Sequence, residues 1–237
     1  MSTPLIELLL FTTLAGACIP LGGLIARFER IRPDWLEQDL RRFVIALGGG
    51  VLLGAVALVL VPRGIEDTGG GLAAPAWLLA GGLLYAGLER WLEARRIEAP
   101  QFVAMLSDFL PESLALGGMF AAGAEGAVLL ALLIGVQNLP EGFNSWRELA
   151  ATGTTRRILP RMVAIVPMGP LFGLAGWFAL SDQPGVLGAI LLLAAGGILY
   201  LTFQDIGPQV GGGKDHVPAI GAVAGFGVAV VGHVLTA

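Results

Sequence analysis

Long apolar runs alternate with short polar segments along the whole chain. A helix needs about 20 residues to cross the hydrocarbon core of a bilayer, and each run is close to that length. The runs are residues 8–26, 43–61, 72–88, 102–124, 126–143, 162–180, 186–204 and 217–237. Because backbone amides inside a bilayer must be hydrogen-bonded, each run is expected to form one helix. The pattern predicts an all-α integral membrane bundle of eight transmembrane helices, with residues 1–237 forming a single domain.

Composition supports the same class of protein. Hydrophobic residues make up 55% of the chain and charged residues 14%, with a mean hydropathy of +0.79. Soluble domains are about a quarter charged, so the charge deficit favours a membrane protein. The 36 glycines suit helices that approach closely. Cys18 is the single cysteine, which excludes a disulfide within the chain.

The distribution of positive charge predicts the orientation in the membrane. The first, third, fifth and seventh connections hold 13 of the 14 Lys and Arg residues, and Arg63 is the exception. The positive-inside rule places such connections in the cytoplasm and therefore both termini outside. The basic residues act as topological signals, and no nucleic-acid partner is expected. Glu66 and Asp67 follow the second run on the outer side, where they are either solvated or attract cations.

Two similar polar motifs interrupt the fourth and fifth runs. Asp-Phe-Leu-Pro-Glu-Ser occupies residues 108–113, and Gln-Asn-Leu-Pro-Glu-Gly occupies residues 137–142. Asp108 and Glu112 are four residues apart and share one helix face, as do Gln137 and Glu141. Because consecutive membrane helices run antiparallel, both polar faces are expected to meet at one depth.

The prolines of these motifs release backbone oxygens. Pro111 and Pro140 cannot donate a hydrogen bond, which frees the carbonyls of Ser107 and Val136. We expect these carbonyls and the side-chain oxygens to point into one cavity. Each intramembrane acid costs about 2.5–3.5 kcal/mol on insertion scales, and a divalent cation would offset that cost. The alternative is that the acids are protonated or pair with an arginine near the helix ends.

At these residues the chain resembles the ZIP (Zrt/Irt-like) family of divalent metal transporters. Residues 137–142 match the fifth-helix pattern Gln-Asn-x-Pro-Glu-Gly of the bacterial branch, and residues 50–53, 62 and 200–209 are also similar. The resemblance implies a metal site between the fourth and fifth helices. Its ligands would be Asp108, Glu112, Gln137, Asn138 and Glu141.

The resemblance also implies transport of zinc by alternating access. It places the chain in the cell membrane, the inner membrane of a bacterium, where its partners are the lipid bilayer, the metal ion and, by family analogy, a second copy in a homodimer. The divalent metal ion is the substrate, and no organic cofactor is expected.

Departures from the family pattern narrow the expected site. Asp108 stands where the family has histidine, and Val166 stands where a related branch has a glutamate that bridges a second metal. A single metal site is therefore expected. Its donors are all oxygens, which suit harder ions such as manganese or magnesium, although zinc also accepts carboxylates. Zinc, manganese and iron all remain open as the substrate.

Other functions and other polar residues stay open at this stage. One alternative is a degenerate family member that binds metal or acts as a scaffold without transport. Another is a membrane enzyme that uses Asp108 and Glu112, although the sequence shows no nucleophile–base set, and a non-enzyme is expected. Asp205 either lines an exit path or caps the seventh helix. His216 and His233 are expected to be structural, because neither has partners at ligand spacing.

Overall fold

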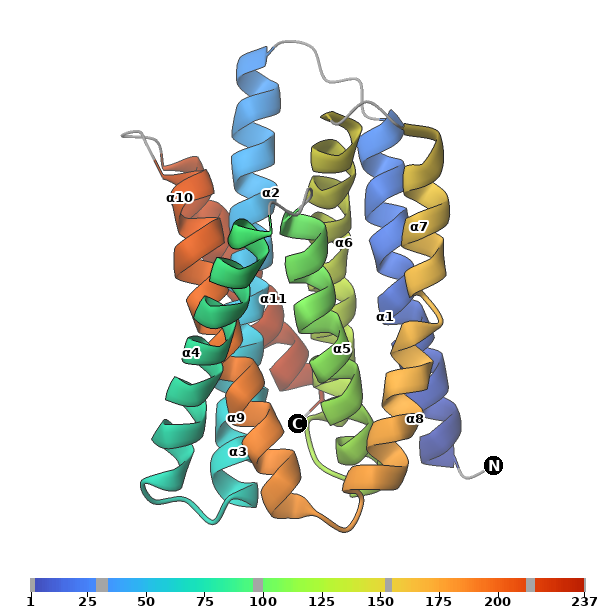
Figure 1. Ribbon diagram of the computed structural model, residues 1–237, viewed down its shortest axis with the longest axis vertical. Coiled ribbons are helices and arrows are strands. Elements are labelled where there is room, and N and C mark those ends of the chain that lie inside the picture. Colours follow the sequence, from blue (N-terminus) through green and yellow to red (C-terminus); the bar gives the residue numbers. More distant parts are fainter. Residues whose placement is uncertain (1–2, 29–33, 96–99, 152–154, 212–215, 237) are drawn as a thin grey trace.

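The computed structural model describes residues 3–28, 34–95, 100–151, 155–211 and 216–236, and all regular structure within these ranges is helical. The helices stack into long rods that run side by side (Figure 1). Within the described residues there are eight such rods, one for each apolar run, so the prediction of an all-α bundle of eight helices is confirmed in helix type and number.

Several rods contain more than one helical segment. The second joins α2 (Asp34–Ala55), the π-helix η1 (Val56–Leu60) and α3 (Val61–Asp67). The sixth joins η2 (Thr155–Arg157), α7 (Ile158–Ile165) and α8 (Met168–Leu180), and the seventh joins α9 (Pro184–Leu201), the π-helix η3 (Thr202–Ile206) and α10 (Gly207–Val210). The others are α1 (Thr3–Phe28), α4 (Ala73–Ala94), α5 (Pro100–Ala121), α6 (Ala127–Ala151) and α11 (Val217–Thr236).

Six of the rods are long and apolar enough to cross a membrane by length and composition. Among the described residues these are Thr3–Phe28, Gln38–Asp67, Ala127–Ala151, Thr155–Leu180, Pro184–Val210 and Val217–Thr236. The chain is therefore a multi-pass membrane protein. The rods α4 and α5 have the length but are not among these six spans, and α5 carries Asp108 and Glu112.

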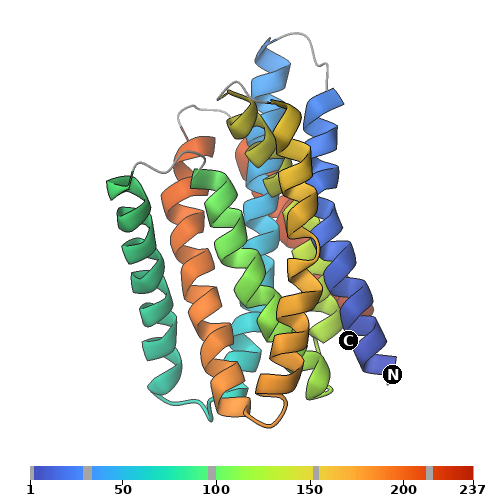
Figure 2. The same cartoon turned by 45° about the vertical axis from the view of Figure 1, so that its right-hand side comes forward.

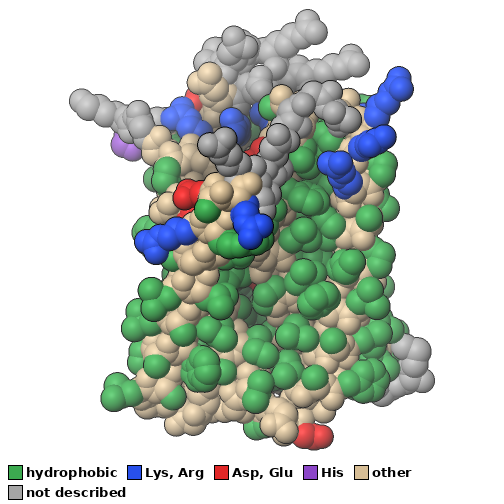
Figure 3. Space-filling view, in the orientation of Figure 1, with side chains coloured by type: hydrophobic (Ala, Val, Ile, Leu, Met, Phe, Trp, Pro, Cys, Tyr) green, Lys and Arg blue, Asp and Glu red, His purple; other side chains and the backbone are tan. Residues whose placement is uncertain are grey.

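Most lysine and arginine residues gather at one end of the bundle. The last turns of α1, α4 and α6 lie at this end, together with the first turns of α2 and α5 (Figure 1). In the same orientation, lysine and arginine side chains cluster there above a broad apolar band (Figure 3). This separation agrees with the alternation of charge along the sequence. Which side of a membrane this end faces stays a prediction.

The rods divide into two bundles. Helices α1, α5, α6 and α8 pack chiefly on one another, and we call them the α5–α6 bundle. The rods α2–α3, α4, α9 and α11 also pack chiefly on one another, and we call them the α4–α9 bundle. Figures 1 and 2 show the two groups side by side, with α2 and α9 facing α6 and α5 across the boundary.

Glycines bring the helices of each bundle into backbone contact. A methyl group at any of four glycines would overlap a carbonyl oxygen of the neighbouring helix. These are Gly142 against Ile19, Gly117 against Gly173, Gly50 against Ala222, and Gly81 against Leu193. At the boundary between the bundles, by contrast, Gly118 faces the side chain of Leu187. Backbone atoms cannot move aside as side chains can, so each bundle is more tightly joined inside than to its neighbour.

Candidate metal site

The two polar motifs meet where α5 packs against α6. The Gln137 Nε2 atom donates hydrogen bonds to both carboxylate oxygens of Glu112, each at 2.9 Å. Both side chains are 0% exposed. The expectation that the two motifs face each other at one depth is therefore confirmed.

Asn138 makes a different connection. Its Nδ2 atom donates to the backbone carbonyl of Ala15 in α1 at 2.9 Å, in a buried position. This bond uses one side of the amide to join α6 to α1 and leaves the Oδ1 atom without a donor. Asn138 therefore stabilises the bundle and also contributes a free oxygen.

Five buried side-chain atoms of the described residues have no hydrogen-bond partner. They are Asp108 Oδ1, Gln137 Oε1, Asn138 Oδ1, Glu141 Oε2 and Asn144 Oδ1. All five are oxygens, and all five belong to α5 or α6. A buried acceptor without a donor costs about 1–3 kcal/mol. A set made only of oxygens has the chemistry that hard cations bind.

A cavity of about 80 Å³ lies at the boundary between the two bundles, and three of the five residues with an unpaired oxygen line it. Asp108, Glu141 and Asn144 line it from α5 and α6, while Asp205 and Gln209 line it from the seventh rod. Residues of α2, including Gly48, Gly49 and Leu52, complete the wall. The volume is several times what one water molecule requires, so an ion with part of its hydration shell fits.

The electrostatics of the cavity favour a cation. The Asp108 carboxylate is close enough to Glu112 and Glu141 for mutual repulsion, and Asp205 faces Asp108 from the other bundle. No lysine or arginine is among the residues that line this cavity. In this conformation, therefore, no arginine at the cavity wall neutralises the acids.

The five predicted site residues fall into three groups. Asp108 and Glu141 line the cavity together, Glu112 and Gln137 bond each other, and Asn138 bonds α1. In the part of the chain that the structure describes, no group of three or more His, Cys, Asp or Glu side chains lies close enough to hold one ion. The coordination sphere of a metal ion bound here would therefore combine carboxylate oxygens with amide or water oxygens.

The sequence analysis missed one residue of the cavity wall, Asn144, and left the role of a second, Asp205, undecided. Asn144 follows Glu141 by three residues, which places both side chains on one helix face. This spacing could have identified Asn144 as a candidate site residue. Asp205 was open between lining a path and capping a helix, and it lines the cavity. It lies in the π-helix η3, a type of helix that is often found at functional sites.

The expectation that the freed carbonyl of Ser107 would point into the cavity is wrong. The Tyr85 hydroxyl of α4 donates a hydrogen bond to this oxygen at 2.6 Å. Pro111 leaves the carbonyl without a helical partner, and a buried unpaired carbonyl is costly. A side chain from another rod supplies the missing donor, which sequence spacing could not indicate.

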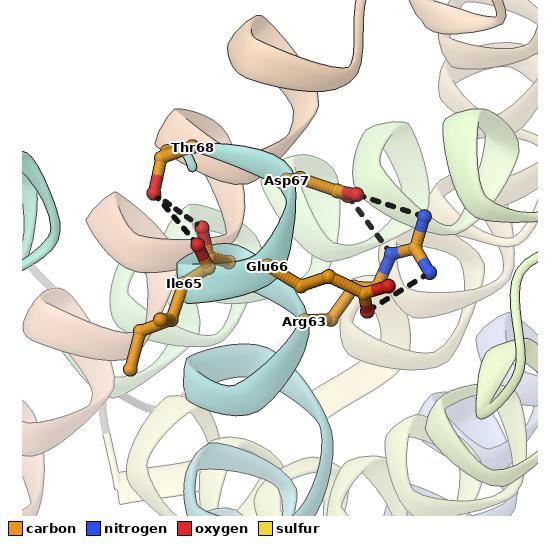
Figure 4. Close-up of polar contacts among 6 residues, drawn as sticks. Arg63, Ile65, Glu66, Asp67 and Thr68 are labelled. Carbon is orange, nitrogen blue, oxygen red and sulfur yellow. Dashed lines mark hydrogen bonds and ion pairs between the residues drawn. The ribbon is translucent and has the colours of Figure 1, made fainter. Parts of the chain in front are cut away.

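The acids at the opposite end of the bundle are paired. Arg63 contacts Asp67 at 2.8 Å and Glu66 at 3.3 Å, all within one helix (Figure 4). The Asp67 side chain is almost fully buried by this arrangement. Asp67 is therefore a buried carboxylate paired with Arg63, whereas Glu66 contacts Arg63 but stays largely exposed to solvent.

Comparison with known proteins adds one relative, and no family model matches the chain. The chain is similar to a zinc transporter. It is 25% identical over 127 residues to zinc transporter zipt-7.1 of Caenorhabditis briggsae. The matched part is 51% of this chain and 32% of that protein, so the chain spans about a third of the length of its relative. This similarity agrees with the resemblance to the ZIP family that the motifs carry.

The bond between Glu112 and Gln137 predicts a non-additive effect on stability. Gln137→Met leaves the buried Glu112 carboxylate without its donor, and we expect a loss of about 1–3 kcal/mol. Adding Glu112→Met removes both partners, which is nearly neutral for a buried pair, so stability should largely return. Thermal unfolding of the purified variants measures both effects. A double variant as unstable as the sum of the two single variants would contradict the pairing.

Proposed function

We propose that this protein transports a divalent metal cation across a membrane, through a site between α5 and α6. The observation that carries the proposal is the set of five unpaired buried oxygens on these helices, of which those of Asp108, Glu141 and Asn144 belong to residues that line a cavity without lysine or arginine. Charged and polar groups inside a membrane protein are costly and mark ion pathways. The similarity to a zinc transporter supports the same function.

The transport step in this proposal is a movement of one bundle past the other. Asp108, Glu141 and Asn144 belong to the α5–α6 bundle, whereas Asp205 and Gln209 belong to the α4–α9 bundle. A displacement of the bundles would carry the first group away from the second and so change the access of a bound ion. Backbone contacts at glycines keep each bundle rigid, and the looser side-chain contacts at the boundary permit sliding.

The same proposal includes location and orientation. The basic end of the bundle would lie in the cytoplasm and both termini outside, by the positive-inside rule. The membrane would be the cell membrane, and a homodimer follows from family analogy.

Metal flux into liposomes tests the proposal. We expect uptake of zinc by the reconstituted protein, with zinc favoured by the similar transporter. Because the available donors are oxygens, which discriminate weakly, manganese uptake should lie within about tenfold of zinc uptake. Protein-free liposomes are the control. A preference for zinc of more than about a hundredfold would contradict an oxygen-only site, since that selectivity is typical of nitrogen or sulfur ligands.

A second candidate function is metal binding or scaffolding without transport. It is favoured by the three hydrogen bonds that engage the amides of Gln137 and Asn138. Titration calorimetry on the same preparation separates the two functions. Binding of zinc without flux would support the second candidate and contradict transport.

A further inference from the structure

Tyr85 connects the two bundles at the candidate site. It lies on α4, is 7% exposed, and its ring packs so closely on Gly197 of α9 that a methyl group there would overlap the ring. The ring is therefore fixed to the α4–α9 bundle. The hydroxyl reaches α5 of the other bundle and donates to the Ser107 carbonyl at 2.6 Å.

The acceptor of this bond is a backbone carbonyl of α5 that has no donor within its own helix. The Ser107 carbonyl is the one that Pro111 leaves without a helical donor, and it precedes Asp108 directly in the chain. The Tyr85 hydroxyl also faces the Asp108 carboxylate. A hydroxyl has one proton, so it bonds to the carbonyl or to the carboxylate at any moment. The bond thus holds the helical turn that carries Asp108.

Packing makes the bond a direct link between the bundles. Helix α4 packs on α9 of its own bundle and has little other contact with α5. A displacement of α5 relative to α4 by more than a fraction of an ångström lengthens the bond beyond hydrogen-bonding distance. The Ser107 carbonyl then loses its donor at the moment when the bundles move.

We propose that Tyr85 is a positioning residue that holds the Ser107–Asp108 turn against the α4–α9 bundle in the conformation described and releases it when the bundles move. The inference rests on the proposed function, because only transport requires that movement. It goes beyond the ligands themselves, since Tyr85 acts through the backbone of α5. One hydroxyl therefore sets both the place of Asp108 and the balance between two arrangements of the bundles.

Distances between spin labels on the two bundles test the inference. Labels are attached to cysteines that replace Glu125, in the turn between α5 and α6, and Leu72, at the start of α4, in a Cys18→Ser background. Both positions are exposed. Tyr85→Phe keeps the ring and removes the hydroxyl. We expect it to raise the population of a second distance about fivefold, the effect of one ordinary hydrogen bond on an equilibrium.

Tyr200→Phe is the matched control. Tyr200 is the other of the two tyrosines of the chain and donates to Glu89, but this bond joins α9 to α4 within one bundle. It should leave the distance distribution unchanged. If Tyr85→Phe also leaves the distance distribution unchanged, the inference is overturned. This holds even if Tyr85→Phe lowers the unfolding temperature, because a hydroxyl that merely satisfies a buried carbonyl would have that effect alone.

The readout separates this inference from the proposed function. The label distances are measured without metal flux. A shift in Tyr85→Phe together with absent flux in the unmodified protein would support the link and contradict transport. Flux in the unmodified protein without any shift in Tyr85→Phe would support transport and overturn the link.

Discussion

Cation uptake is expected to fall by at least about a hundredfold when Asp108→Asn is combined with Glu141→Gln, while the protein stays folded. Loss of groups that merely support metal ligands already lowers metal affinity about 10- to 100-fold, and these two carboxylates line the cavity directly. Both substitutions keep the shape of the side chain and remove its charge. The measurement is initial uptake of zinc and manganese into liposomes.

The same double variant should be at least as stable as the unmodified protein. The two carboxylates repel each other in a buried place, and each has an oxygen without a hydrogen-bond donor. Neutral amides remove the repulsion and supply N–H donors. Uptake and unfolding temperature are therefore expected to change in different directions, which distinguishes a transport site from a purely structural one.

Glu93→Gln is the control for this experiment. Glu93 lies on α4 and is exposed, so its neutralisation changes the net charge without altering the cavity. Its uptake should equal that of the unmodified protein. If the double variant keeps uptake within about twofold of the unmodified protein, Asp108 and Glu141 do not carry the ion.

Gly117→Ala is expected to have the largest effect on stability. A methyl group at this position overlaps the backbone carbonyl of Gly173, where α5 meets α8. Because a backbone atom cannot rotate aside, the two helices must separate, at a cost of about 2–3 kcal/mol. For a chain of this size, the unfolding temperature should fall by about 5–10 °C. Thermal unfolding in one detergent measures the change.

Gly87→Ala is the matched control for Gly117→Ala. Gly87 is also helical, but a methyl group there meets nothing within 4 Å. Alanine favours helix over glycine, so Gly87→Ala should leave stability unchanged or raise it slightly. Equal destabilisation by both substitutions would show that loss of glycine, and not the contact between α5 and α8, is responsible.

Several features of the fold follow from local sequence. Apolar runs of membrane-spanning length predict the eight rods, because a helix in a bilayer pairs its own backbone groups without help from distant residues. Departures from that pattern are local as well. The sixth run is interrupted at Val166 and Pro167, where α7 ends and α8 begins, as a proline inside a run allows.

Part of the candidate site is also readable from sequence. The four-residue spacing of Asp108 with Glu112, and of Gln137 with Glu141, places each pair on one helix face. The antiparallel course of consecutive helices then brings the two faces together, and the bond between Glu112 and Gln137 confirms this. That all five expected residues would share one ion is a prediction that the described contacts leave open.

The sequence by itself determined the helices, the basic end of the bundle and the meeting of the two proline motifs. Only the tertiary structure decided which rods form each bundle and that Asp205 and Gln209 complete the cavity wall. It also decided that the Tyr85 hydroxyl donates a hydrogen bond to the carbonyl freed by Pro111. The reason is physical. Helix formation depends on residues within one or two turns, whereas the partner of a side chain depends on how rods distant in sequence pack.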